Sequence, residues 1–229
     1  MVKELEGDGS ASFHFIQGPY EVAPPVGYED FFGGPPYHRF IVPTDAEADS
    51  IDVIERIRDF PQLETPEMTM RELMTYGVAK TDDSARHTLE FLYGIMEKEG
   101  PFDGIIGYSE GATIAGTLLL HEQVREELEG RPPMFKCALF FGGWPPITPT
   151  LDGLVLADES DLTIEIPTTH ISMFCVLFVQ IAESLTGNQS VPWILISTAI
   201  LHFTTYAIQT QLSFLIMQKD TLCREISIW

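Results

Sequence analysis

The chain has 229 residues and 45% of them are hydrophobic, which is enough for one globular domain with a full core but not comfortably for two. Its 13 Lys and Arg are outnumbered by 34 Asp and Glu, so the formal net charge is -21. We therefore expect no binding to nucleic acid and no attraction to an anionic membrane surface. Three cysteines without a CxxC pair argue against a disulfide scaffold or a Cys-ligated zinc site. The first residues contain no secretory signal, so the expected location is the reducing cytoplasm.

The charge is spread unevenly along the chain. Residues 171–229 contain two basic and three acidic side chains, whereas residues 1–170 contain the other 11 basic and 31 acidic ones. Between Glu183 and Lys219, 35 consecutive residues include no Asp, Glu, Lys or Arg. The composition therefore divides the chain near residue 170 into an acidic domain and an atypical, largely uncharged tail.

The N-terminal part predicts one strand, a long loop and two helices. Residues 11–16 alternate apolar and polar side chains before a Gln-Gly-Pro turn, which predicts a strand. No regular element fits the Gly- and Pro-rich residues 18–44, so we expect a long ordered loop over a pocket. Isoleucines at helical spacing predict a helix over 45–59, and another helix is expected around 68–76. The aromatic residues expected either to line the pocket or to pack over the sheet are Tyr20, Tyr28, Phe31, Phe32 and Tyr37.

The middle of the chain alternates helices with short apolar strands. A helix with apolar residues at i, i+4, i+7 and i+11 is expected to begin at Asp82 or Asp83 and to stop at Gly100. The remaining predicted elements are a strand over 104–107, a helix over about 112–129, and strands over 137–141 and 168–179. Strands that are apolar throughout are typical of a buried parallel sheet, so the predicted fold class is α/β.

The residues from Gly107 to Gly111 form a G-x-S-x-G pentapeptide between an apolar strand and an amphipathic helix. A nucleophile elbow requires this context, because flanking glycines let the strand and the helix approach closely while the serine projects its hydroxyl from a strained backbone. The pattern predicts Ser109 as a catalytic nucleophile. The alternative is a glycine-rich turn that contains a bystander serine.

A catalytic serine also needs a base, an acid that orients the base, and donors for the oxyanion. In a nucleophile-elbow fold the acid and the histidine follow the serine in that order. We expect His121 on a helical turn that points away from Ser109, His170 in a buried or half-buried structural role within a strand, and His202 in an apolar run without a loop to present its ring. Asp152, Asp158 and Asp161 precede the last predicted strand instead of following it. The acid and the base of the triad are therefore left unassigned.

Five blocks agree in order and spacing with one known family: FHFIQGP at 13–19, FFGGPPY at 31–37, GPFDGIIGYSEGA at 100–112, LFFGG at 139–143 and IPTTH at 166–170. Together they resemble the fungal FSH-type serine hydrolases, a group that includes the LovG-like esterases of secondary-metabolite gene clusters. The chain is also similar to hydrolases of Alternaria host-selective toxin clusters. The resemblance covers about residues 10–171 and implies an α/β-hydrolase fold, with a mostly parallel sheet and flanking helices.

The resemblance also implies an activity and two site residues. Members of the family hydrolyse esters or thioesters, and LovG-like members release a polyketide from its carrier domain, so the expected partner is a small acyl substrate or a carrier-bound polyketide. Ser109 matches the nucleophile, and the backbone N–H of Glu110 matches one oxyanion donor. The family more often has Gln at that position, so the Glu110 side chain is expected to point away from the oxyanion. Neither a cofactor nor a metal is expected.

Two departures from the family pattern concern the catalytic machinery. This chain starts after the family's first strand and the Leu-His-Gly-type segment that supplies a second oxyanion N–H, so we expect those parts to be largely absent. The Gly-x-x-Asp loop with the triad Asp and the later loop with the triad His do not follow His170. The interpretation is a partial hydrolase domain over 1–170, followed over 171–229 by a tail typical of translated intron or frameshifted sequence.

The tail and the function each leave alternatives open. The uncharged residues 184–218 are compatible with a transmembrane helix, although polar residues interrupt them, with a replacement for core strands, or with an unstructured tail. The first hypothesis for function is a serine esterase or thioesterase of fungal polyketide or toxin biosynthesis. The second is a catalytically inactive hydrolase remnant that lacks the triad Asp and His.

Overall fold

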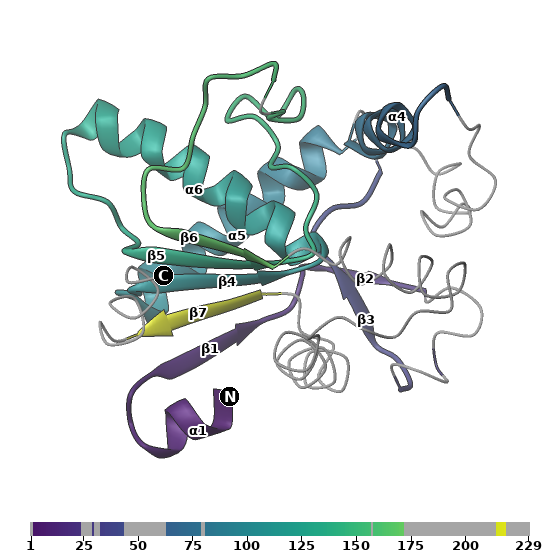
Figure 1. The fold of residues 1–229 in the computed structure, drawn as a ribbon. Helices are drawn as coiled ribbons and strands as arrows, with labels where there is room; N and C mark the ends of the chain where they lie inside the picture. Colours follow the sequence, from purple (N-terminus) through teal and green to yellow (C-terminus); the bar gives the residue numbers. More distant parts are fainter. Residues whose placement is uncertain are drawn as a thin grey trace, which may run out of the picture.

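The computed structural model describes residues 2–23, 29, 33–43, 63–78, 81–156, 158–171 and 214–218. Its main feature is a five-stranded sheet with the order β1-β7-β4-β5-β6. The strands are β1 (Ser12–Ile16), β4 (Gly104–Tyr108), β5 (Cys137–Phe141), β6 (Thr168–Ile171) and β7 (Phe214–Gln218). β4, β5 and β6 are parallel, and β7 is antiparallel to both β4 and β1 (Figure 1). β1 therefore runs in the same direction as β4, β5 and β6, and only β7 runs against them.

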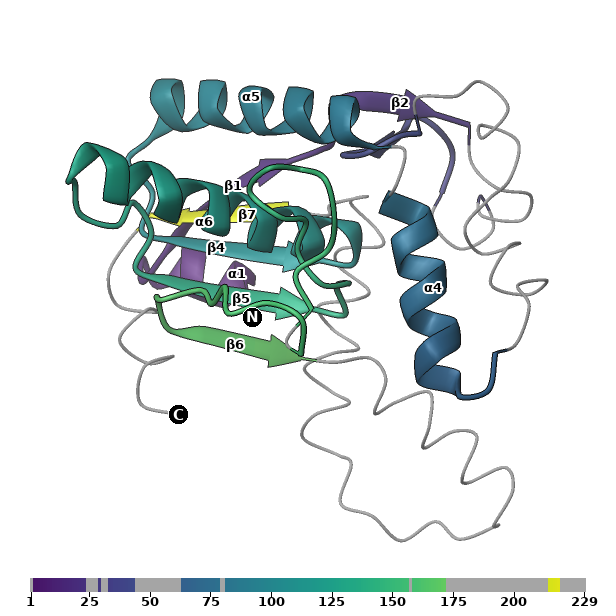
Figure 2. The ribbon, with the colours of Figure 1, turned by 90° about the horizontal axis from the view of Figure 1, so that it is seen from above.

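Two long helices, α5 (Asp82–Glu99) and α6 (Glu110–Glu129), lie over one face of this sheet, as the view from above shows (Figure 2). They pack through a core cluster that includes Leu92, Leu118 and, from β4, Ile105. The next strand residue, Ile106, belongs to a second cluster with Leu139 and Phe141 of β5. Because adjacent strand residues point to opposite faces, β4 and β5 are buried on both sides, which explains why they are apolar throughout. The α/β class predicted from the sequence is confirmed.

The structure corrects some predictions for individual elements, and others lie outside the described residues. The loop predicted over 18–44 contains two short strands, β2 (Tyr20–Val22) and β3 (Tyr37–Arg39), which pair antiparallel; the prediction of no regular element was wrong there. The second predicted helix is α4 (Pro66–Val78), and an unpredicted helix, α1 (Val2–Gly7), precedes β1. The helix predicted over 45–59 and residues 172–179 of the last predicted strand lie outside the described residues. Cys137, fully buried in β5, is disulfide-bonded, which the cysteine pattern had not predicted.

The described part of the C-terminal tail lies inside the sheet. All five residues of β7 pair with β1, and four of them also pair with β4. This placement corresponds to the alternative in which the tail replaces core strands, while the reading of residues 171–229 as a gene-model artefact stays a prediction. Most of the uncharged stretch lies outside the described residues. Within the described ranges, no helix combines the length and the apolar character needed to cross a membrane.

Candidate active site

Ser109 forms the turn between β4 and α6, at the end of the sheet where the parallel strands terminate (Figure 1). Its φ of 52° and ψ of -121° lie in a region that L-residues rarely adopt, and the residue is exposed. A non-glycine residue in such a conformation costs about 1–3 kcal/mol and persists only where its surroundings enforce it. A strained, exposed serine between a buried strand and a helix has the geometry of a nucleophile elbow.

The glycine two residues before Ser109 permits the close approach of α6 to β4. A Cβ added to Gly107 would lie 2.4 Å from Ala112 Cα and 2.5 Å from Gly111 O. Both are main-chain atoms, so a larger residue would displace the first turn of the helix. Gly143, just after β5, has a similar role, because its added Cβ would lie 2.5 Å from Ala112 Cβ.

We predict that Gly107→Ala destabilises the fold by about 2 kcal/mol or more, because the added methyl group collides with main-chain atoms that cannot move independently of α6. Urea denaturation measures the change. Gly94→Ala is the matched control: Gly94 lies exposed in α5 with nothing within 4 Å of an added Cβ, so this variant should be neutral or up to about 1 kcal/mol more stable. Equal destabilisation by both substitutions would contradict the close approach at the elbow.

Hydrogen bonds from β5 and from the segment after it hold the elbow in place. Ser109 N donates to Phe141 O at 2.7 Å, and Ala112 N donates to Ser109 O at 2.9 Å. On the buried side of α6, the Thr113 hydroxyl accepts from Trp144 N at 2.9 Å and donates to Trp144 O at 3.1 Å. The strained turn is therefore fixed by its own helix, by β5 and by the segment that follows β5.

Glu110, the first residue of α6, has its carboxylate bonded to residues 39–41. Oε2 accepts from Arg39 Nε at 2.9 Å and lies 2.9 Å from Arg39 Nη2, while Oε1 accepts from Phe40 N at 2.6 Å and from Ile41 N at 3.2 Å. The negative charge of Glu110 is therefore paired with Arg39, and its carboxylate is directed toward residues 39–41. Among the described residues, none accepts a hydrogen bond from the Glu110 N–H, which is the group that the resemblance assigns to the oxyanion. The role of this N–H stays a prediction.

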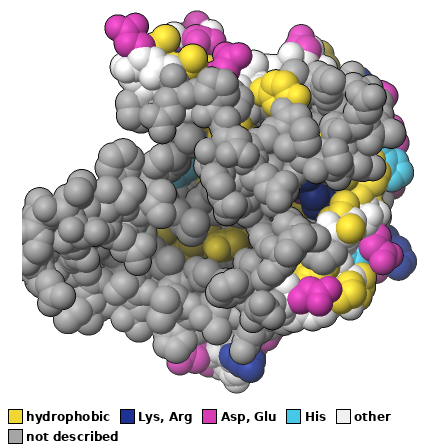
Figure 3. Space-filling model, turned by 90° about the vertical axis from the view of Figure 1, so that its right-hand side faces the viewer, with side chains coloured by type: hydrophobic (Ala, Val, Ile, Leu, Met, Phe, Trp, Pro, Cys, Tyr) yellow, Lys and Arg dark blue, Asp and Glu magenta, His cyan; other side chains and the backbone are white. Residues whose placement is uncertain are grey.

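Arg39 and the segment around it were missed in the sequence. They lie in the predicted loop, and no motif marks them; the one available signal was an isolated basic residue in a strongly acidic region. The pocket proposed for this loop also stays a prediction. Tyr37 is buried, and its hydroxyl donates to Gly33 O, while Tyr20 packs its ring 5.6 Å from that of His87. Tyr28, Phe31 and Phe32 lie outside the described residues. Figure 3 faces this end of the sheet, where some hydrophobic side chains of the described residues are visible at the surface.

In the described part of the chain, the candidate histidines after Ser109 do not contact the Ser109 side chain. His121 Nδ1 lies 2.8 Å from the hydroxyl of Tyr93, so its ring faces α5. His170 lies in β6, 3.1 Å from Thr168 Oγ1 and with its ring 4.9 Å from that of Phe140, but it is exposed. The structural role expected for His170 is therefore not that of a buried residue. His202 lies outside the described residues.

We predict a pH effect on stability from His121. Its burial, reinforced by the cations Arg125 and Arg86 and opposed by Glu122, lowers its pKa from the usual 6.5. The folded state therefore binds this proton less readily than the unfolded chain, so the contribution to stability is present above the unfolded pKa and is lost as the pH falls below it. Between about pH 7 and about pH 5 the wild type should lose stability relative to His121→Gln. Urea denaturation at both pH values checks this, and parallel losses in the two proteins would contradict it.

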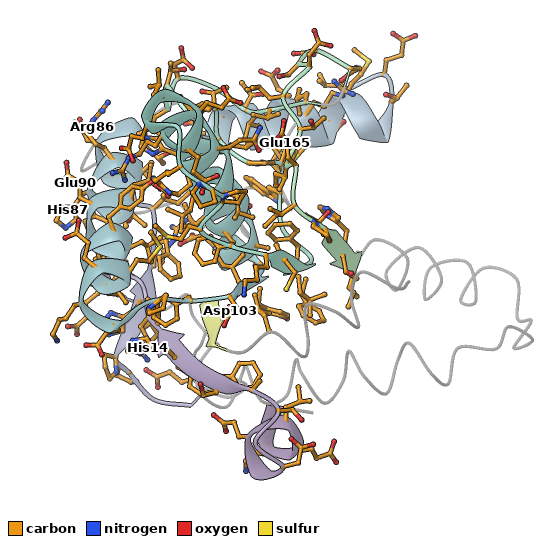
Figure 4. The ribbon with its side chains drawn as sticks, turned by 90° about the vertical axis from the view of Figure 1, so that its left-hand side faces the viewer. His14, Arg86, His87, Glu90, Asp103 and Glu165 are labelled. Atoms are coloured by element: carbon orange, nitrogen blue, oxygen red, sulfur yellow. The ribbon has the colours of Figure 1, made fainter. Side chains whose placement is uncertain are left out.

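The described histidines before Ser109 also have other partners. The ring of His14 lies 5.9 Å from that of Phe102, and the ring of His87 lies 5.6 Å from that of Tyr20. His38 Nδ1 lies 3.1 Å from Gly18 O. His14 lies on β1, and His87 points outward from α5 (Figure 4).

The candidate acids have other partners as well. The Thr148 and Thr150 hydroxyls donate to Asp152, both at 2.6 Å, and Arg71 pairs with Asp158 at 2.9 Å. These contacts lower the pKa of each carboxyl. Asp161 is exposed.

Strand β6 ends at the same edge of the sheet as the elbow. Tyr108 pairs with Phe141, and Phe141 pairs with Ile171. Gly142 N also donates to Ile171 O at 2.9 Å, which ties the two strand ends together. The residues that follow Ile171 lie outside the described ranges.

A mostly parallel sheet, helices packed on it and a strained serine between a central strand and a helix together define an α/β-hydrolase-type protein. Residues 2–172 match the model of the family described as Serine hydrolase (FSH1). The chain therefore belongs to this serine hydrolase family, and the expected resemblance to the FSH-type serine hydrolases is confirmed.

Individual relatives are fungal hydrolases and esterases. The chain is 34% identical over 97 residues to "Hydrolase phiM" of Fungal sp., which covers 42% of this chain and 46% of that protein. It is 30% identical over 105 residues to "Esterase alnB" of Emericella nidulans, covering 43% and 36% of the two chains. It is 25% identical over 174 residues to "Hydrolase phiM" of Talaromyces stipitatus, covering 75% and 57%. The chain thus spans less than two thirds of the length of each of these relatives. No solved structure matches it.

Proposed function

We propose that the protein is a serine esterase or thioesterase that works through an acyl-enzyme on Ser109. One observation carries this proposal: Ser109 is exposed and held at φ 52° on the turn between β4 and α6. Strain of this kind is retained where a side chain must be presented to a substrate. Membership of the FSH1 serine hydrolase family supports the same class of reaction.

In the proposed reaction, Ser109 Oγ attacks the carbonyl carbon of the substrate and transfers its proton to a general base. The carbonyl oxygen becomes an oxyanion, which the Glu110 N–H and the positive end of α6 stabilise. Collapse of this intermediate expels the alcohol or thiol, which takes up the proton, and leaves an ester on Ser109. Water then attacks that ester, so the products are a free acid and the regenerated serine.

The proposed substrate is an acyl ester or thioester of fungal secondary metabolism, either a small molecule or a polyketide on its carrier domain, and the proposed location is the cytoplasm. The fungal relatives named as hydrolases and esterases support the ester chemistry.

A second candidate function is a non-catalytic remnant of a hydrolase. One observation favours it: within the described ranges, the candidate histidines and the bonded aspartates contact groups other than the Ser109 hydroxyl. A serine without a base is a weak nucleophile, so this protein would keep the fold and lose the reaction.

A panel of acyl substrates distinguishes the two candidates. Wild type and Ser109→Ala are assayed with 4-nitrophenyl esters of increasing chain length and with the matching N-acetylcysteamine thioesters. A serine esterase should show turnover that requires Ser109 and rises with acyl length if an apolar pocket binds the chain. Equal background rates in the two proteins would favour the remnant.

A further inference from the structure

Glu110 connects the elbow to a part of the chain 71 residues away. Its carboxylate receives two contacts from the Arg39 guanidinium and two from the adjacent main-chain N–H groups of Phe40 and Ile41. The side chains of Arg39 and Glu110 are 36% and 23% exposed, so the ion pair by itself would contribute about 1 kcal/mol or less. Hydrogen bonds from two main-chain donors to a charged acceptor are stronger and fix its position.

The segment that Glu110 holds is itself fixed to α5. The Ser84 hydroxyl accepts from Val42 N at 3.0 Å and donates to Val42 O at 2.7 Å. The Thr88 hydroxyl donates to Phe40 O, and the Phe40 side chain is fully buried in the core. Residues 40–42 are therefore a rigid support anchored on α5, and Glu110 links the first turn of α6 to this support.

We propose that Glu110 is a positioning residue for acyl transfer, an inference that rests on the proposed role of Ser109. Its carboxylate accepts hydrogen bonds from Phe40 N and Ile41 N, and we call these two bonds the tie. The tie connects the residue after the nucleophile to the support on α5 and so fixes the direction of the Glu110 N–H. Arg39 neutralises the carboxylate, so that a negative charge next to the nucleophile does not oppose the oxyanion. Both effects act on the transition state more than on the bound substrate.

Four variants separate the tie from the charge. Glu110→Ala removes both, whereas Glu110→Gln keeps an oxygen that can accept from Phe40 N and Ile41 N. Arg39→Gln leaves the carboxylate without its counter-charge, and the double variant Arg39→Gln/Glu110→Gln is neutral again. Glu90→Ala is the control for loss of a carboxylate, because Glu90 is exposed and points outward from α5 (Figure 4).

The measurements are the rate at which a fluorophosphonate modifies Ser109 and the values of kcat and KM for the preferred ester. Glu110→Ala should lower the modification rate and kcat by about 10- to 100-fold with KM little changed, because a small misorientation of a catalytic group has an effect of this size. Glu110→Gln should stay within about threefold of wild type. The double variant should react faster than Arg39→Gln, a rescue that a purely structural ion pair would not produce. Glu90→Ala should match the wild type.

Hydrogen exchange tests the tie independently of activity. In Glu110→Ala, the amides of Phe40 and Ile41 should exchange about 10- to 100-fold faster, because they lose a charged acceptor. Unchanged exchange together with unchanged modification of Ser109 would overturn the proposal, as would a double variant slower than Arg39→Gln. A wild type that the probe does not modify contradicts the proposed function, and with it the positioning role of Glu110. The exchange rates then still show whether the hydrogen bonds from Phe40 N and Ile41 N to Glu110 exist.

Discussion

Replacing Ser109 with alanine is expected to lower ester hydrolysis by at least about 10⁴-fold, to the background rate. The reason is that no acyl-enzyme can form without the Ser109 hydroxyl, so hydrolysis then depends on direct attack of water on the substrate. The fold should be retained, because Ser109 is exposed and its main-chain bonds to Phe141 and Ala112 do not involve the side chain. The assay is initial-rate hydrolysis of the preferred ester, with circular dichroism to confirm folding.

Ser10→Ala is the matched control for this substitution. Ser10 lies between α1 and β1, and its main-chain N–H donates to Asp8 at 2.8 Å, so loss of its hydroxyl should leave the rate unchanged. Residual hydrolysis by Ser109→Ala above a tenth of the wild-type rate would contradict covalent catalysis at this residue.

Replacing Ile216 with proline is expected to destabilise the fold by about 3 kcal/mol or more. Ile216 is the middle residue of β7 and pairs with His14 of β1 and Ile105 of β4. Proline removes a ladder hydrogen bond and does not fit a central strand. The loss is a large part of the total stability of about 5–15 kcal/mol that is usual for a domain.

Ile216→Val is the control, since another β-branched residue keeps the strand geometry and the main-chain N–H. Urea denaturation measures both variants, and size-exclusion chromatography shows whether the proline variant exposes strand edges and aggregates. If the two variants are equally stable, residues 214–218 do not stabilise the sheet, and the interpretation of the tail as foreign sequence gains support.

The parts of the fold that were predicted correctly depend on local pattern. Helix α5 has an apolar stripe and ends before Gly100, and β5 is an apolar run between turns, so neighbouring residues determine both. β2 and β3 were missed because their pairing joins Tyr20 to Arg39 across a segment dominated by Gly and Pro. The position of β7 could not be predicted either, since it depends on contacts between residues about 200 apart in the chain.

The candidate site also has one part that the sequence predicts and one that it does not. The elbow could be predicted because a strand, two glycines, a serine and a helix follow one another within a few residues. The contact between Glu110 and residues 39–41 could not, because it arises only when β3 is placed beside the start of α6. No sequence spacing relates Glu110 to Arg39, and the acidic composition of the domain gave no reason to select one arginine.

Covalent labelling tests the central claim most directly. The purified full-length chain is treated with a fluorophosphonate, and mass spectrometry of the intact protein and of its peptides locates the adduct. The proposed function predicts one adduct per chain, on Ser109, which is lost in Ser109→Ala and retained in Ser10→Ala. A folded wild-type chain that forms no adduct, or forms it on another residue, would contradict the assignment of Ser109 as the nucleophile.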